Sequence, residues 1–112
     1  MNSRTETLLW VAQRASAAVL ALCVVAHLAT IIYAVQGGLT GAEILGRTRG
    51  NAAWFAFYSV FVLAATVHAP IGLRSVFTEW LGWRGKSRDL ALLLFSVMIF
   101  VMGIRAVVSV FS

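Results

Sequence analysis

Three long apolar stretches dominate the pattern of hydrophobic and polar positions along the chain. They cover residues 15–42, 50–73 and 90–111, and only the last contains a charged residue, Arg105. A helix that crosses a bilayer needs about 20 predominantly apolar residues. An arginine near the end of such a helix can extend its side chain to the interface. The pattern therefore predicts an all-α membrane protein with three transmembrane helices, over approximately residues 8–36, 51–80 and 88–111.

Composition supports a bilayer as the solvent of this chain. Hydrophobic residues make up 61% of its 112 residues and charged residues 12%, against about 45–50% and about 25% in soluble domains. Cys23 is the only cysteine, which excludes an internal disulfide and any cysteine-based zinc or iron–sulfur site within the chain. The net charge of +5 lies where the apolar stretches end, so it predicts no nucleic-acid partner.

Basic residues are distributed unequally between the two sides of the predicted helices. One side carries Arg4, Arg14, Arg74, Arg84, Lys86 and Arg88, and the other carries Arg47, Arg49 and Arg105. The richer side is expected to be cytoplasmic, which predicts a cytoplasmic N-terminus in the bacterial inner (cytoplasmic) membrane. A cleaved signal peptide is the competing interpretation of the first stretch, but its apolar part exceeds the roughly 7–15 residues of a signal sequence. Glu43, Arg47 and Arg49 are expected in a solvated outer loop.

Both histidines of the chain, His27 and His68, lie within the apolar stretches, whereas no acidic residue does. Ionisable groups at membrane depth are costly and usually functional. The lack of a carboxylate argues against a proton or cation carrier. A neutral imidazole in hydrocarbon needs a partner, and haem iron is a common one. The alternative is that each histidine hydrogen-bonds a neighbouring helix.

Helical spacing places each histidine on a stripe of mostly small or polar residues. The first stripe is Ser16, Leu20, Cys23, His27 and Thr30, and the second is Phe61, Ala64, His68, Gly72, Ser75 and Glu79. Gly72 leaves space for a flat macrocycle one turn beyond the second histidine. Pro70 is expected to kink the helix there.

The two histidines are expected at different heights in the membrane. His27 lies about 18 Å from Ala15, whereas His68 lies only about 9 Å from Arg74 and the inner surface, at 1.5 Å per residue. They are therefore poor candidates for the two axial ligands of one haem. Each would need a partner histidine from another chain or another copy.

The segment that begins at His68, HAPIGLRSVFTEW, resembles the second helix of the small membrane-anchor subunits of succinate dehydrogenase and fumarate reductase. In that family a haem-ligating histidine is followed by a glycine one turn later and by an acidic–aromatic pair at the inner helix end. The matching positions here are His68, Gly72, Glu79 and Trp80. The family pair is commonly Asp-Tyr, so Trp80 departs from it, although an indole N–H can donate to a quinone in place of the tyrosine hydroxyl.

The first helix is similar to the same family. Arg14-Ala15-Ser16 resembles the Arg-x-Ser/Thr motif at the inner end of helix one. The segment from Ser16 to His27 resembles the first helix of the larger two-haem anchors, where a histidine in that place ligates the outer haem.

The resemblance implies a cytochrome b membrane-anchor subunit of a succinate:quinone oxidoreductase, non-catalytic alone and part of a larger multi-subunit helical bundle. Its expected partners are a flavoprotein subunit, an iron–sulfur subunit and a second anchor chain, related or identical. Its expected cofactor is one haem b, or two, shared with that second anchor, and quinone is the substrate. The implied haem residues are His68 and His27 as iron ligands, with Arg14, Arg74 and Gly72 around the group. The implied quinone residues are Ser16, Arg14, Glu79 and Trp80.

Several of these residues also have an alternative interpretation as purely structural residues. Arg14 and Arg74 can also be arginines that anchor the helix ends at the membrane interface. Ser16 can also form a hydrogen bond with the backbone of its own helix. For the whole chain, the alternatives are a small oligomeric transporter or channel subunit and a haem-free structural subunit of another respiratory complex.

Overall fold

The computed structural model describes residues 3–38 and 40–112, and within these residues the chain forms four helices. They are α1 (Ser3–Gly37), α2 (Gly41–Thr48), α3 (Ala52–Leu81) and α4 (Lys86–Phe111). Three of them, α1, α3 and α4, are long and apolar enough to cross a membrane. The expectation of an all-α protein with three transmembrane helices is confirmed.

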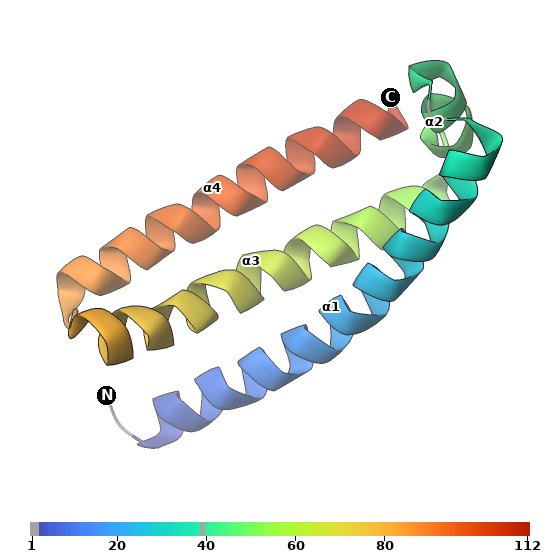
Figure 1. Ribbon diagram of the computed structural model, residues 1–112. Helices are drawn as coiled ribbons and strands as arrows, with labels where there is room; N and C mark the ends of the chain where they lie inside the picture. The colour runs from blue at the N-terminus through green and yellow to red at the C-terminus, as the bar shows by residue number, and fades with distance from the viewer. Residues whose placement is uncertain (1–2, 39) are drawn as a thin grey trace.

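The helix α3 lies between α1 and α4 and runs antiparallel to both (Figure 1). Their outer surfaces are apolar: Leu22 is 75% exposed and Leu94 is 61% exposed. An exposed apolar surface of this extent is unstable in water. Lipid or neighbouring subunits must cover it.

The helix α1 begins at Ser3, five residues before the predicted start. The hydroxyl of Thr7 donates to the carbonyl of Ser3 over 2.9 Å, which supports the first turn. Glu6 lies in that turn, where a negative charge favours the helix dipole. The carboxylate of Glu6 also lies 3.3 Å from Nη2 of Arg74, so the polar start of α1 is held against the C-terminal part of α3. The end of the bundle where α1 begins is called the inner end below, and the end that carries α2 is called the outer end.

The helix α2 corrects the expectation of a loop around Glu43, Arg47 and Arg49. Residues 41–48 are helical because Thr40 caps their start, its hydroxyl accepting the backbone N–H of Glu43 over 3.2 Å. The pattern Thr-x-x-Glu at residues 40–43 is a signature of helix starts, so the sequence contained the signal. Gly41 is the first residue of the helix and does not prevent its formation.

The end of α2 is fastened to the end of α4. Thr48 is buried, and its hydroxyl donates to the carbonyl of Val110 over 2.8 Å. The N–H of Gly50 donates to the carbonyl of Phe111 over 2.7 Å. Carbonyls in the last turn of a helix have no partner within it. The segment around α2 therefore closes the outer end of the bundle.

The helix α3 continues through Pro70 without interruption. Proline has no N–H, so the carbonyl of Thr66 loses its partner within the helix. The hydroxyl of Ser96 on α4 donates to that carbonyl over 3.0 Å. A neighbouring helix thus satisfies the backbone group that Pro70 leaves unpaired, as membrane proteins require.

Candidate functional site

The predicted stripe on α1 faces α3. Ser16 and Cys23 are buried there, and His27 is half-buried. The imidazole of His27 packs edge-to-face against Tyr58 at 5.8 Å and Phe61 at 5.7 Å between ring centroids. Two aromatic side chains of α3 therefore pack against the imidazole ring of His27.

The stripe on α3 is packed over only part of its length. Ala64 is buried, and Phe61, His68 and Gly72 are half-buried. Beyond them, Ser75 and Glu79 are exposed. The packed part of the stripe is thus the part around the second histidine.

Gln13 of α1 is a neighbour of this site that sequence reasoning missed. A Cβ added to Gly72 would meet Nε2 of Gln13 at 3.4 Å. Gly72 follows His68 by one helical turn, so the amide lies beside the histidine face. The signal that would have found Gln13 is the pairing of α1 with α3, which the pattern of one helix does not contain.

Three buried polar atoms have no hydrogen-bond partner among residues 3–38 and 40–112. They are Nδ1 of His27, Nδ1 of His68 and Oε1 of Gln13. Buried polar groups are nearly always paired in native proteins, and exceptions often mark functional positions. Each histidine therefore has a buried ring nitrogen for which the described part of the chain supplies no hydrogen-bond partner in this arrangement.

The two histidines lie at different heights, as expected. His27 is level with Tyr58 and Phe61, which it contacts. His68 comes seven residues after Phe61, which is about 10 Å further along α3. One flat group cannot take both histidines as its two axial ligands, because those lie directly above and below one iron.

The remaining predicted site residues divide into two levels. Ser16 shares a groove with Ala64 and Val67, close to the level of His68, and its hydroxyl donates to the carbonyl of Gln13 over 3.2 Å. Its neighbour Arg14 is exposed and stacks 5.2 Å from the ring centroid of Trp10.

Glu79 and Trp80 lie at the inner end of α3, far from that groove. Both are exposed, Trp80 to 82%. Glu79 follows His68 by 11 residues, or about 17 Å. The chain alone does not bring the four predicted quinone residues into one pocket. The resemblance assigned these residues to one site, whereas the pairing of α1 with α3 leaves them at different levels of the bundle.

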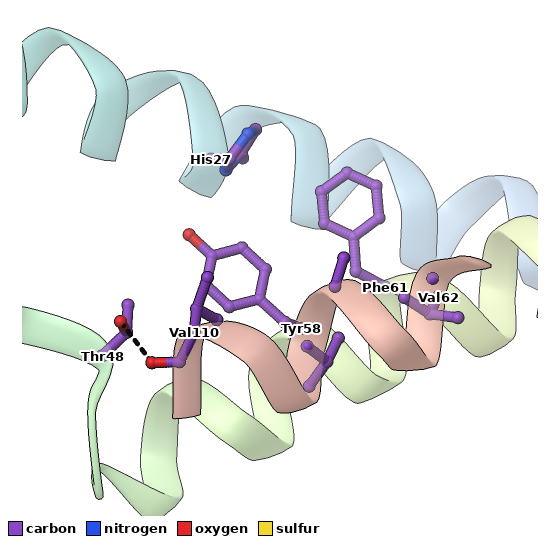
Figure 2. Close-up of a pocket in the computed structure, with 9 residues that line it drawn as sticks. His27, Thr48, Tyr58, Phe61, Val62 and Val110 are labelled. Carbon is purple, nitrogen blue, oxygen red and sulfur yellow. Dashed lines mark hydrogen bonds between the residues drawn. The ribbon is translucent and has the colours of Figure 1, made fainter. Parts of the chain in front are cut away.

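A cavity of about 370 Å³ opens beside His27 between α1, α3 and α4. Figure 2 shows the imidazole directed from α1 toward the ring of Tyr58, with Thr48 and Val110 at one end. Its lining is His27, Thr48, Tyr58, Phe61, Val62, Gly103, Ala106, Val107 and Val110. A second cavity of about 150 Å³ also touches His27 and Thr48, together with Arg47. The helix α2, which was expected to be a loop, thus forms one wall of the cavities beside His27.

A further cavity of about 340 Å³ lies at the inner ends of the three long helices. Thr5 comes from α1, Arg74 from α3, and Asp89 and Ser96 from α4. Sequence reasoning assigned Arg74 to a cofactor, but Asp89 to nothing. The cavity combines a cation, an anion and hydroxyls near the inner interface.

The donor set fits a haem better than a bare metal ion. Within residues 3–38 and 40–112, no cluster of three or more His, Cys, Asp or Glu side chains can hold a metal. A haem iron already has four porphyrin nitrogens and needs only axial ligands such as imidazole. The half-buried imidazole of His68 is a side chain of the kind that meets that requirement.

The comparisons with known proteins give one family. The sequence profile of a family described as the succinate dehydrogenase/fumarate reductase transmembrane subunit matches residues 1–106. No curated protein and no solved structure matched the chain in the corresponding searches.

Proposed function

Because the chain belongs to the succinate dehydrogenase/fumarate reductase transmembrane subunit family, it is a multi-pass membrane-anchor subunit of such a complex, and we propose that it binds haem b and contributes to a quinone site. The observation that carries the haem proposal is the half-buried imidazole of His68 within a membrane-spanning helix, where an ionisable ring needs a partner. With Nε2 on the iron, Nδ1 keeps its proton and acts as a donor. When bound, haem b supplies a one-electron carrier.

The arginines around His68 have different parts in this proposal. Arg74 is already paired with Glu6. Arg14 forms no ion pair within the described part of the chain and lies close in sequence to Ser16, at the level of His68. Arg14 is therefore the better candidate to bind a haem propionate, with the charge-assisted hydrogen bonds that guanidinium forms. Gly72 itself adds no side chain to the surface of α3 beside His68.

His27 is proposed as the ligand of a second, outer haem. The support is its buried, unpaired Nδ1 and its separation in height from His68. Each haem then takes its second axial histidine from a second anchor chain, related or identical, because this chain has only two histidines.

The quinone is proposed to bind between the level of His68 and the inner surface. Ser16 and Arg14 stand at the deep end of this interval, and Glu79 and Trp80 at the shallow end. Arg14 has a long side chain that can extend toward the interface. Trp80, being largely exposed, has its indole N–H free to donate to a quinone carbonyl.

Electrons are proposed to arrive from a flavoprotein and an iron–sulfur subunit docked on the inner side. That side is proposed to be the cytoplasmic face of a bacterial inner membrane, because most of the basic residues flank it. The anchor performs no catalysis alone. Its residues position the quinone and the haem within reach of the electron donors.

The test is a reduced-minus-oxidised spectrum of the purified complex with haem quantified per anchor chain. We expect b-type absorption, the loss of one haem in His68→Ala and the loss of the other in His27→Ala. Absence of b-type absorption from the wild-type complex would remove the ligand roles of both histidines. Purification without a flavoprotein would contradict the proposed source of electrons.

A further inference from the structure

Gln13 is half-buried against the face of α3 that carries His68, yet it has no role in the function proposed above. Its Nε2 lies 3.4 Å from the position of a Cβ on Gly72. On a helix, residues four apart stand above one another on the same face. The Gln13 amide therefore lies one helical turn from the imidazole, on the side of α3 that faces α1.

The unpaired atoms of Gln13 and His68 are chemically complementary. Oε1 of Gln13 is an acceptor, and Nδ1 of a histidine that binds iron through Nε2 is a donor. Both atoms are buried, and neither has a partner within residues 3–38 and 40–112. The third such atom, Nδ1 of His27, belongs to the outer cavity about 10 Å along the helices. Gln13 and His68 are thus the pair that can satisfy each other.

We propose that Gln13 is the positioning residue of His68, its Oε1 accepting a hydrogen bond from Nδ1–H so that Nε2 is held toward the iron. The bond forms by rotation of the Gln13 side chain, because the two residues already lie on facing helices within one turn. Metal-binding histidines generally donate their other ring N–H to an acceptor, which fixes the ring and raises its basicity. This inference rests on the proposed haem ligation by His68.

The hydrogen bond has a measurable electronic consequence. An acceptor on Nδ1–H makes the imidazole a stronger donor to iron, which stabilises the oxidised state and lowers the midpoint potential. Gln13→Leu removes the acceptor and should raise the potential of the haem held by His68. Gln13→Glu offers a stronger, charged acceptor and should lower it. Opposite shifts from two substitutions of similar size are not what a packing role produces.

The experiment is an optical redox titration of the purified complex, with low-spin ferric EPR spectra that report ligand donor strength. Gln36→Leu and Gln36→Glu are the matched controls, because Gln36 is an exposed glutamine of the same helix. We expect the two Gln13 variants to move the potential and the g values of one haem in opposite directions. The Gln36 variants should leave both unchanged.

Two failures are distinguishable. A wild-type complex without haem, or a His68→Ala complex that keeps its full haem content, contradicts the haem ligation and with it this inference. If haem depends on His68 but the Gln13 variants shift potential and g values no more than the Gln36 variants, the positioning role alone is wrong. Should the leucine variant assemble poorly, the glutamate variant still decides, since an unchanged EPR spectrum there overturns the proposal.

Discussion

Gly103 on α4 lies close against Val62 of α3, and adding one methyl group there has a calculable effect. A Cβ at Gly103 would lie 2.6 Å from Cγ1 and 2.9 Å from Cγ2 of Val62. Carbon atoms in contact prefer about 3.5–4.0 Å, so the overlap is about 1 Å. Val62 cannot rotate away, because a β-branched side chain in a helix has one strongly preferred rotamer. The helices must therefore separate.

The expected cost of Gly103→Ala is about 1–3 kcal/mol, the range for overpacked cores. Gly46→Ala is the matched control, because nothing lies within 4 Å of its added Cβ and α2 is helical there. In an open helical position alanine is favoured over glycine by roughly 0.5–1 kcal/mol. Unfolding of the purified protein in mixed detergent micelles, followed by tryptophan fluorescence, measures both changes.

The double variant Gly103→Ala with Val62→Ala tests the cause. Removing the two methyl groups of Val62 relieves the overlap, so the double variant should lose less stability than the two single changes added together. If Gly103→Ala is as stable as Gly46→Ala, or if Val62→Ala gives no rescue, the close contact does not determine helix packing here. The reasoning from this distance would then be refuted.

Two further predictions follow from polar contacts. Thr48→Val removes the hydrogen bond to the carbonyl of Val110 and should cost about 1 kcal/mol; faster amide exchange at Gly50 is the measurement, and unchanged exchange would contradict the role of Thr48 at the outer end. Glu6→Gln breaks the pair with Arg74, in which the Arg74 side chain is 21% exposed and the Glu6 side chain 53%, and an ion pair open to solvent on one side contributes only about 0–1 kcal/mol. Stability and haem content should therefore hardly change, and a large loss of either would contradict a surface role for this pair.

The transmembrane helices and the stripe of α1 were predictable because they depend on local periodicity alone. Uncharged stretches of sufficient length define a span, and residues three or four apart share a face. Counting residues from the helix ends even gave the difference in height between His27 and His68. Each of these properties is contained in one helix.

The parts that escaped prediction depend on how helices pair. Gln13 precedes an arginine near a helix end, where a polar residue is ordinary, and only the register between α1 and α3 puts it against Gly72. The same register separates Arg14 from Glu79. The short helix α2 is a different case, since Thr40 and Glu43 signalled it and the nearby glycines obscured the signal.

The hydrogen bond from Ser96 to the carbonyl of Thr66 makes the residue types at positions 70 and 96 depend on each other. Only a proline at position 70 frees that carbonyl, and only a donor from α4 satisfies it in hydrocarbon. Without the Ser96 hydroxyl, the carbonyl of Thr66 has no hydrogen-bond donor. Without Pro70, the backbone N–H of residue 70 competes with the Ser96 hydroxyl for the same carbonyl. Descendants of this sequence should therefore exchange Pro70 and Ser96 together, as a correlated pair, more readily than either one singly.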